Sequence, residues 1–123
     1  MKHVMLVDDH NAFRESLALM LKWHSDFKES VQAQSLAEAR RVLGNSYRNL
    51  DLAIVDLDLA NGGDFDLIKE LRMTHPDIPV LAITLERDVD RRERALRAGV
   101  GEVLTMAASL REIVDVAKRL VSE

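Results

Sequence analysis

One apolar run that ends in a carboxylate constrains the fold of this chain more than any other stretch. The run extends from Leu52 to Val55, is followed at once by Asp56, and leads into the turn sequence Asn61-Gly62-Gly63. A short, uninterrupted apolar run is typical of a strand that is buried on both faces of a parallel sheet. Open α/β sheets bind ligands outside the carboxyl ends of their strands, so Asp56 lies where a ligand crevice is expected.

Five apolar segments alternate with five helical patterns along the chain. The expected strands cover residues 4–7, 30–34, 52–56, 79–84 and 102–105, and the expected helices cover residues 12–23, 35–44, 64–74, 88–98 and 109–121. Ser35 and Ser109 are typical helix-opening residues, and the helix ending near residue 74 stops before His75-Pro76. This alternation predicts an α/β fold, a doubly wound sandwich with a mostly parallel sheet, as a single domain over residues 1–123.

Composition excludes several classes of protein. The chain has 123 residues, of which 47% are hydrophobic and 31% charged, as in an ordinary soluble domain with one core. It has no cysteine, which excludes disulfides and thiolate metal sites and suits a reducing compartment. No apolar run reaches membrane-spanning length and the start does not resemble a signal peptide, so we expect a cytoplasmic protein. A net charge of -4 provides no general attraction to nucleic acid.

A second strand also ends in acidic residues, so Asp56 is not the only carboxylate expected at this edge of the sheet. Asp8 and Asp9 follow the apolar residues 4–7, and Thr84 ends the expected fourth strand. Strands one, three and four can be neighbours in a doubly wound sheet, so these side chains would converge. Crowded carboxylates repel one another and require a cation or protons.

The expected ligands are oxygen atoms, which suit Mg²⁺. A carboxylate beside Mg²⁺ can act as a nucleophile toward phosphorus and form an aspartyl phosphate. A hydroxyl at Thr84 could then donate a hydrogen bond to the new phosphoryl oxygens. The combination therefore points to phosphoryl chemistry at the carboxyl edge of the sheet.

With these residues the chain resembles the receiver domains of two-component response regulators. The resemblance covers the full length, with an acid pair after strand one, an Asp after strand three and a Thr after strand four. It implies a flavodoxin-like fold with a five-stranded parallel sheet of order 2-1-3-4-5. The opening Leu-Val-Asp-Asp-His-Asn-Ala-Phe-Arg-Glu-Ser-Leu is most similar to the branch with a C-terminal LuxR-type helix-turn-helix output domain.

The resemblance also implies roles for individual residues. Asp56 would accept a phosphoryl group from a sensor histidine kinase, and Thr84 would be the switch hydroxyl. Asp9 and Asp56 would bind Mg²⁺ with the backbone carbonyl of Asp58, while Asp8 would act through a metal-bound water. The domain would be a signalling module and not a true enzyme. It would control an effector domain beyond the end of this chain, which in the LuxR-type branch is a DNA-binding domain. A homodimer through the fourth and fifth helices is a further expectation from the same resemblance.

Several positions depart from the family pattern. Met106 occupies the place of the usual strand-five Lys, Val103 that of the usual aromatic residue, and Leu85 that of a usually small residue. Asp58 adds a further negative charge beside the site. These departures predict a receiver that binds Mg²⁺ but is phosphorylated or switched poorly. A replacement cation at Arg87 is conceivable, although an Arg that opens a helix is usually solvated.

Two other functions remain open. The first is a degenerate receiver that serves as a docking or dimerisation module without phosphorylation, which the missing Lys favours and the complete acid set disfavours. The second is an enzyme, since Asp56-Leu57-Asp58 resembles the nucleophile motif of haloacid-dehalogenase-type phosphatases. In that family the motif comes early and the acid pair late, the reverse of this chain, and the core is longer.

Other polar residues receive simpler interpretations. Five arginines between residues 87 and 97 alternate with acids, so we expect solvated helix faces with ion pairs and no direct nucleic-acid binding. His3, His10, His24 and His75 fit no metal-ligand spacing. Trp23 is expected to pack at the end of the first helix.

Overall fold

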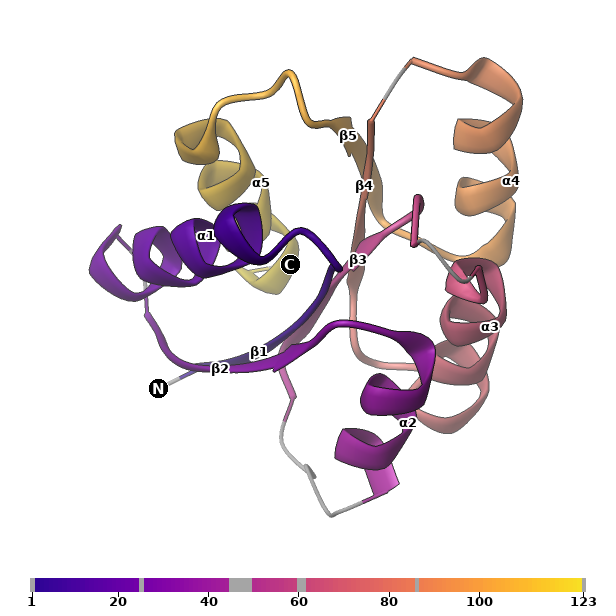
Figure 1. The fold of residues 1–123 in the computed structure, drawn as a ribbon, viewed down its shortest axis with the longest axis horizontal. Helices are drawn as coiled ribbons and strands as arrows, with labels where there is room; N and C mark the ends of the chain where they lie inside the picture. The colour runs from indigo at the N-terminus through magenta and orange to yellow at the C-terminus, as the bar shows by residue number, and fades with distance from the viewer. Residues whose placement is uncertain (1, 25, 45–49, 60–61, 86, 123) are drawn as a thin grey trace.

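Strands and helices alternate along the whole described chain (Figure 1). The computed structural model describes residues 2–24, 26–44, 50–59, 62–85 and 87–122, with backbone alone for residues 28–30, so Asn61 of the expected turn lies outside it. The elements are β1 (Lys2–Val7), α1 (Asn11–His24), β2 (Phe27–Ala33), α2 (Leu36–Gly44), β3 (Leu52–Asp56), α3 (Asp64–Thr74), β4 (Val80–Thr84), α4 (Val89–Ala98), β5 (Glu102–Thr105) and α5 (Leu110–Ser122). The expected order of elements is confirmed.

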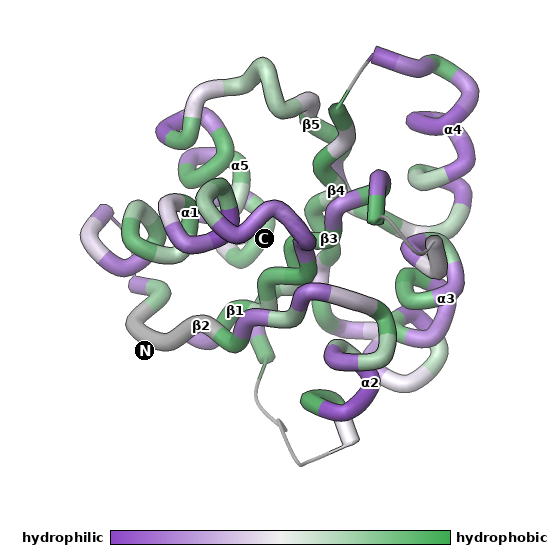
Figure 2. The backbone as a smooth tube through the Cα atoms, in the orientation of Figure 1, coloured by the Kyte–Doolittle hydropathy of each residue, from purple (hydrophilic) through white to green (hydrophobic). Residues whose placement is uncertain are grey.

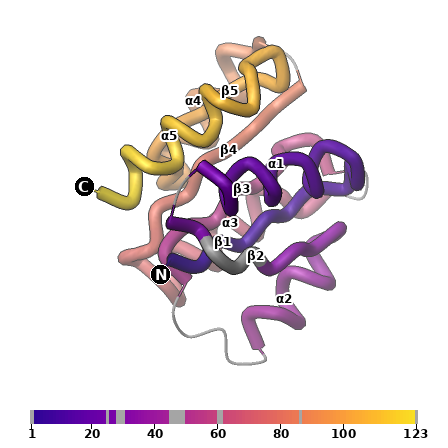
Figure 3. Tube along the Cα trace, turned by 90° about the vertical axis from the view of Figure 1, so that its left-hand side faces the viewer, coloured from indigo at the N-terminus to yellow at the C-terminus, as the bar shows by residue number. Residues whose placement is uncertain are grey.

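The strands form one parallel sheet of order β2-β1-β3-β4-β5, the flavodoxin-like order that the family resemblance implied. Helices α1 and α5 cover one face, and α2, α3 and α4 cover the other (Figure 1). Figure 3 shows α1 and α5 in front of the sheet when that face is turned toward the viewer. Because β1, β3 and β4 are neighbours, their carboxyl ends meet at one edge of the sheet.

Two apolar layers hold the helices to the sheet. Side chains alternate along β1, so that Val4 and Leu6 pack toward α1 and α5 while Met5 and Val7 pack toward α2 and α3. Every residue of β3 and β4 is buried. Figure 2 shows apolar residues concentrated in the central strands and a mostly polar α4 at the surface. The two-sided burial explains why these strands are continuous apolar runs and do not alternate.

Side-chain caps fix where three helices begin. The hydroxyl of Ser35 accepts a hydrogen bond from the Glu38 amide at 3.2 Å, and the hydroxyl of Ser109 accepts one from the Glu112 amide at 3.1 Å. The Asp88 carboxylate accepts a hydrogen bond from the Arg91 amide at 3.1 Å, so α4 starts one residue after the expected position.

Two sequence expectations are wrong. Strand β2 begins at Phe27, three residues early, because it pairs with β1 from Lys2 onward and Phe27 is buried there. Trp23 does not pack and is 70% exposed. Helix α1 buries Leu17 and Leu21 instead, and Trp23 is about 200° around the helix from Leu21 at 3.6 residues per turn. No helix among the described residues is both long and apolar enough to cross a bilayer.

Candidate functional site

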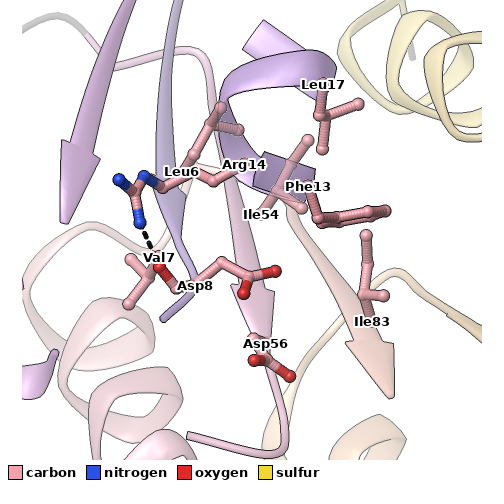
Figure 4. A pocket seen from close by; sticks show the side chains of 9 residues that line it. All are labelled: Leu6, Val7, Asp8, Phe13, Arg14, Leu17, Ile54, Asp56 and Ile83. Atoms are coloured by element: carbon pink, nitrogen blue, oxygen red, sulfur yellow. Dashed lines mark hydrogen bonds between the residues drawn. The ribbon is translucent and has the colours of Figure 1, made fainter. Parts of the chain in front are cut away.

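The carboxyl ends of β1, β3 and β4 bring the predicted site residues together. Val7 pairs with Val55, so Asp8 and Asp56 follow neighbouring strand ends. Both carboxyl groups are nearly inaccessible, with Asp8 6% and Asp56 2% exposed. Figure 4 shows them beside one another at the ends of β1 and β3. The predicted convergence of the acids is therefore present in the structure.

The Asp56 carboxylate is buried, and only one of its two oxygens accepts a hydrogen bond from the described residues. Its Oδ1 accepts a hydrogen bond from the Asp58 amide at 2.8 Å, while its Oδ2 accepts none within the described part of the chain. Burial raises the pKa of Asp56 to about 7, and the negative charges of Asp8, Asp58 and Asp9 add to the rise against the opposing amide bond. Without a cation, this group is thus partly protonated near neutral pH.

His10 lies inside the acid cluster, which sequence spacing did not predict. Its Nδ1 is 2.9 Å from Asp8 Oδ1, 3.3 Å from Asp9 Oδ1 and 3.5 Å from Asp56 Oδ2. The hydrogen bond to Asp8 raises the pKa of His10, with the charges of the three acids adding to the rise and partial desolvation opposing it. His10 has no other His or Cys near it in sequence, so only the convergence of the strand ends reveals this placement.

The cluster fits a small, hard cation. One ligand atom from each of Asp8, Asp9, His10 and Asp56 lies within 4.8 Å of the others. The carboxylate oxygens outnumber the single nitrogen, and the buried Asp56 Oδ2 accepts no hydrogen bond from any residue that the structure describes. Such a donor set suits Mg²⁺ better than the softer transition metals.

Thr84 ends β4 beside the cluster and is 5% exposed, but its hydroxyl has a partner other than Asp56. It donates a hydrogen bond to Asp58 Oδ2 at 3.0 Å, and the Leu85 amide donates to the same oxygen at 2.6 Å. The other oxygen of Asp58 forms an ion pair with Arg91, whose Nη1 also donates to the Leu57 carbonyl at 2.9 Å.

Among the residues that the structure describes, the arginine that pairs with the Asp58 carboxylate is Arg91, whereas the sequence had suggested Arg87 as a replacement cation. Arg87 is exposed at the start of the α4 region, as expected for a solvated arginine. Sequence reasoning missed Arg91 because it lies 33 residues from Asp58. A usable signal was its position three residues after the capping Asp88, which places it in the first turn of α4.

Arg14 is another residue that sequence reasoning missed, and it is buried. It is 6% exposed, and its guanidinium donates to the Asp8 carbonyl at 2.7 Å and to Gln32 Oε1 at 2.8 Å. Figure 4 shows the bond to Asp8 from α1. Arg14 lies three and seven positions before the buried Leu17 and Leu21, which places it on the same face of α1. An arginine on this apolar face is the sequence feature that could have indicated its burial.

The three residues that depart from the expected sequence pattern lie in β5 or directly after β4 and β5. The Met106 amide donates to the Thr84 carbonyl at 2.8 Å, so the backbones of these two residues lie side by side at the ends of β5 and β4. The Met106 side chain is partly buried against the apolar layer between the sheet and α1 and α5. Val103 is buried in the opposite layer, while Leu85 is 49% exposed. Met106 thus presents a thioether to the core where a cation would be expected.

Comparison with known proteins gives one consistent family. The family model of the response regulator receiver domain matches residues 4–118. The response regulator protein PilR of Pseudomonas aeruginosa is 33% identical over 119 residues, which cover 94% of this chain and 26% of PilR. The response regulator GacA of Pseudomonas viridiflava is 31% identical over 119 residues, covering 94% of this chain and 53% of GacA. The chain thus spans between a quarter and about half the length of these relatives.

Solved structures agree on the fold. A CheY-like receiver domain protein from Methanospirillum hungatei superimposes with a TM-score of 0.88 at 19% identity, covering 99% of this chain and 94% of that one. A Burkholderia pseudomallei response regulator, solved with a phosphorylated aspartic acid, calcium ion and citrate, has a TM-score of 0.85 at 24% identity, with 99% and 69% covered. At these identities the likeness establishes the architecture.

Proposed function

The chain belongs to the family of response regulator receiver domains, and from that premise we propose that Asp56 accepts a phosphoryl group from a sensor histidine kinase. One observation carries the proposal. The Asp56 carboxyl group is buried at the end of β3, and its Oδ2 accepts no hydrogen bond from the described residues. A buried oxygen without a donor, at the ligand-binding edge of a parallel sheet, is poised for a reacting group or a cation.

The transfer makes and breaks one bond to phosphorus. A carboxylate oxygen of Asp56 attacks the phosphorus of the phosphohistidine, and the phosphorus–nitrogen bond breaks. The kinase imidazole leaves with the electron pair of that bond and takes up a proton from solvent. An acyl phosphate remains on Asp56, at a site that is closed enough to limit its hydrolysis.

The acid cluster would hold Mg²⁺. We propose that Asp9, Asp56 and the Asp58 carbonyl bind the ion, with Asp8 acting through a bound water. When bound, Mg²⁺ supplies positive charge that favours the ionised form of the acids and attracts phosphoryl oxygens. Arg14 keeps Asp8 in place by holding its carbonyl. The raised pKa of Asp56 makes this support necessary, because only the carboxylate is a nucleophile.

Met106 makes this receiver atypical. The side chain beside Thr84 contributes apolar packing and no charge, so the phosphoryl group has one cation fewer than the family pattern supplies. We propose weak or altered switching as the result. The output would be an effector domain beyond this chain, and the opening sequence favours a LuxR-type DNA-binding domain and transcriptional control. A homodimer through α4 and α5 is part of the same proposal.

A docking module that works without phosphorylation is the second candidate function. The observation that favours it is the Thr84 hydroxyl, which already donates to Asp58. In this alternative Mg²⁺ binds but no phosphoryl transfer follows.

Intact mass after incubation with acetyl phosphate tests the proposal. The wild-type chain should gain one phosphoryl group only when Mg²⁺ is present, and Asp56→Asn should gain none. Asp66→Asn, which changes an exposed acid in the first turn of α3, is the matched control and should behave as wild type. Mg²⁺ binding without any mass gain would contradict the proposal and favour the docking module.

A further inference from the structure

We propose that, before phosphorylation, the Asp58 carboxylate occupies the hydrogen-bond donors that a phosphoryl group on Asp56 would use. These donors are the Thr84 hydroxyl and the Leu85 amide, so Asp58 holds the end of β4 as a phosphoryl group would hold it. The proposal rests on Asp56 being the phosphoacceptor, and it assigns a regulatory role to a side chain next to that residue. We refer to Asp58, Thr84, Leu85 and Arg91 as the Asp58 clasp.

The first part of the clasp involves the end of β4. Asp58 Oδ2 accepts two hydrogen bonds, from the Thr84 hydroxyl at 3.0 Å and from the Leu85 amide at 2.6 Å. The Asp58 amide donates to Asp56 Oδ1 at 2.8 Å, so the clasp is directly connected to the phosphoacceptor. An anion therefore occupies the two donors that lie beside Asp56 at the end of β4.

The second part of the clasp involves α4. Arg91 forms an ion pair with Asp58 Oδ1 and donates to the Leu57 carbonyl at 2.9 Å. Its own amide is held by the capping carboxylate of Asp88. Asp58 thus joins the loop after β3 to the first turn of α4. Arg91 brings a positive charge to the Asp58 carboxylate, whereas the Met106 side chain packs in the apolar layer and brings none.

The clasp has to open for a phosphoryl group to engage the same donors. The Thr84 hydroxyl has one proton and the Leu85 amide has one, so each can serve Asp58 or a phosphoryl oxygen but not both fully. Phosphorylation would then exchange one anion for another, leaving the end of β4 nearly unchanged. Arg91 could follow the phosphoryl group, since a guanidinium binds phosphate as well as carboxylate. The competition lowers the affinity of the site for the phosphoryl group.

Charge repulsion alone would give a similar but distinguishable result. Asp58 places a negative charge near Asp56 whether or not it accepts hydrogen bonds. Asp58→Ala removes both the charge and the acceptor, whereas Asp58→Asn removes the charge and keeps an acceptor oxygen. If the clasp competes with the phosphoryl group, Asp58→Ala should increase the affinity for a phosphoryl mimic more than Asp58→Asn does. If charge repulsion alone acts, the two variants should increase that affinity equally.

The test is an amide NMR titration with Mg²⁺ and beryllofluoride, a mimic of the phosphoryl group. Asp58→Ala should bind beryllofluoride about tenfold more tightly than wild type, the equivalent of one hydrogen bond to a charged group. Asp58→Asn should show a smaller gain, and Asp66→Ala should match wild type. Mg²⁺ affinity, measured for each variant before beryllofluoride is added, separates a change in metal binding from a change in beryllofluoride binding.

A second readout needs no phosphoryl mimic. In the wild-type protein without beryllofluoride, the Leu85 amide should be protected from hydrogen exchange, and Asp58→Ala should abolish that protection. Equal beryllofluoride affinity in wild type and Asp58→Ala, or unchanged Leu85 protection, would overturn the clasp. If no variant binds beryllofluoride, the phosphoacceptor proposal fails, and Leu85 protection alone decides the clasp.

Discussion

Two residues of the acid cluster, Asp56 and His10, bind protons more strongly in the folded chain than in the unfolded chain. Burial raises the pKa of Asp56 from its ordinary 3.8 to about 7, and the hydrogen bond to Asp8 raises the pKa of His10 above 6.5. At pH values between the ordinary pKa and the folded-state pKa of each group, the folded state holds more protons than the unfolded state. The free energy of unfolding therefore decreases as pH increases through this range. Both groups act in the same direction.

The free energy of unfolding of the metal-free chain should therefore decrease from pH 5 to pH 8. Asp56→Asn should flatten much of this dependence and stabilise the chain at pH 8 by about 2 kcal/mol, since a neutral side chain no longer needs a proton. Urea unfolding at several pH values measures both effects. An unchanged pH slope in Asp56→Asn would show that Asp56 titrates normally; Asp66→Asn is the control.

Arg14 is expected to support the site from within α1. Arg14→Met fits the same space but leaves the Asp8 carbonyl and Gln32 Oε1 without their donor, which should cost about 2 kcal/mol. Mg²⁺ affinity should also fall because Asp8 is held less firmly. Arg111→Met, at an exposed position of α5, should change neither quantity. Calorimetric Mg²⁺ titration and urea unfolding distinguish the outcomes, and wild-type Mg²⁺ affinity in Arg14→Met would exclude the supporting role.

Met106→Lys should restore a cation beside Thr84. A lysine there could reach the phosphoryl group, so the fraction of chain phosphorylated by acetyl phosphate at steady state should increase, with some loss of stability from the removed apolar packing. Ala107→Lys introduces the same charge at the next, exposed position and should have a much smaller effect. Equal phosphorylation of the two variants would mean that Met106 does not limit the reaction.

The order of strands and helices was predictable because local chemistry and tertiary burial agree in most of them, whereas the start of β2 depends on its pairing with β1 and was placed three residues late. The apolar runs of β3 and β4 are buried on both faces, and Ser35 and Ser109 cap the helices that they were expected to open. The side-chain contacts around Asp58 were not predictable. They depend on how the loop after β3 packs against α4. Asp58 and Arg91 are 33 positions apart, so no local sequence pattern predicts their contact.

Helix α4 connects to the site through its first turn. Asp88→Ala removes the hydrogen bond to the Arg91 amide and should lower the free energy of unfolding by about 1 kcal/mol, the usual cost of losing an N-cap. It should also increase hydrogen exchange at the start of α4. Asp90→Ala, which removes an acid in the same turn, should cost less. Equal effects would indicate that charge near the helix terminus matters and the cap does not.

At the scale of the whole molecule, the sheet order explains why one edge carries the chemistry. Placing β1 between β2 and β3, with β4 beside β3, brings the acids and Thr84 together without any further segment. Ion pairs continue from the site across the surface: Arg91 to Asp58, Arg92 to Glu102 at 3.9 Å, and Arg119 to the same glutamate at 3.0 Å. The Asp58–Arg91 pair joins the loop after β3 to the first turn of α4, and the two Glu102 pairs join α4 and α5 to β5, without a residue in common.

The identity of the phosphorylated residue is the most direct test of Asp56 as the phosphoacceptor. Borohydride reduction of an aspartyl phosphate converts the residue to homoserine, and peptide mass analysis then locates it. After incubation with acetyl phosphate and Mg²⁺, we expect homoserine at position 56 and at no other aspartate. Homoserine at position 8, 9 or 58, or none at all under conditions in which Mg²⁺ binds, would contradict this expectation.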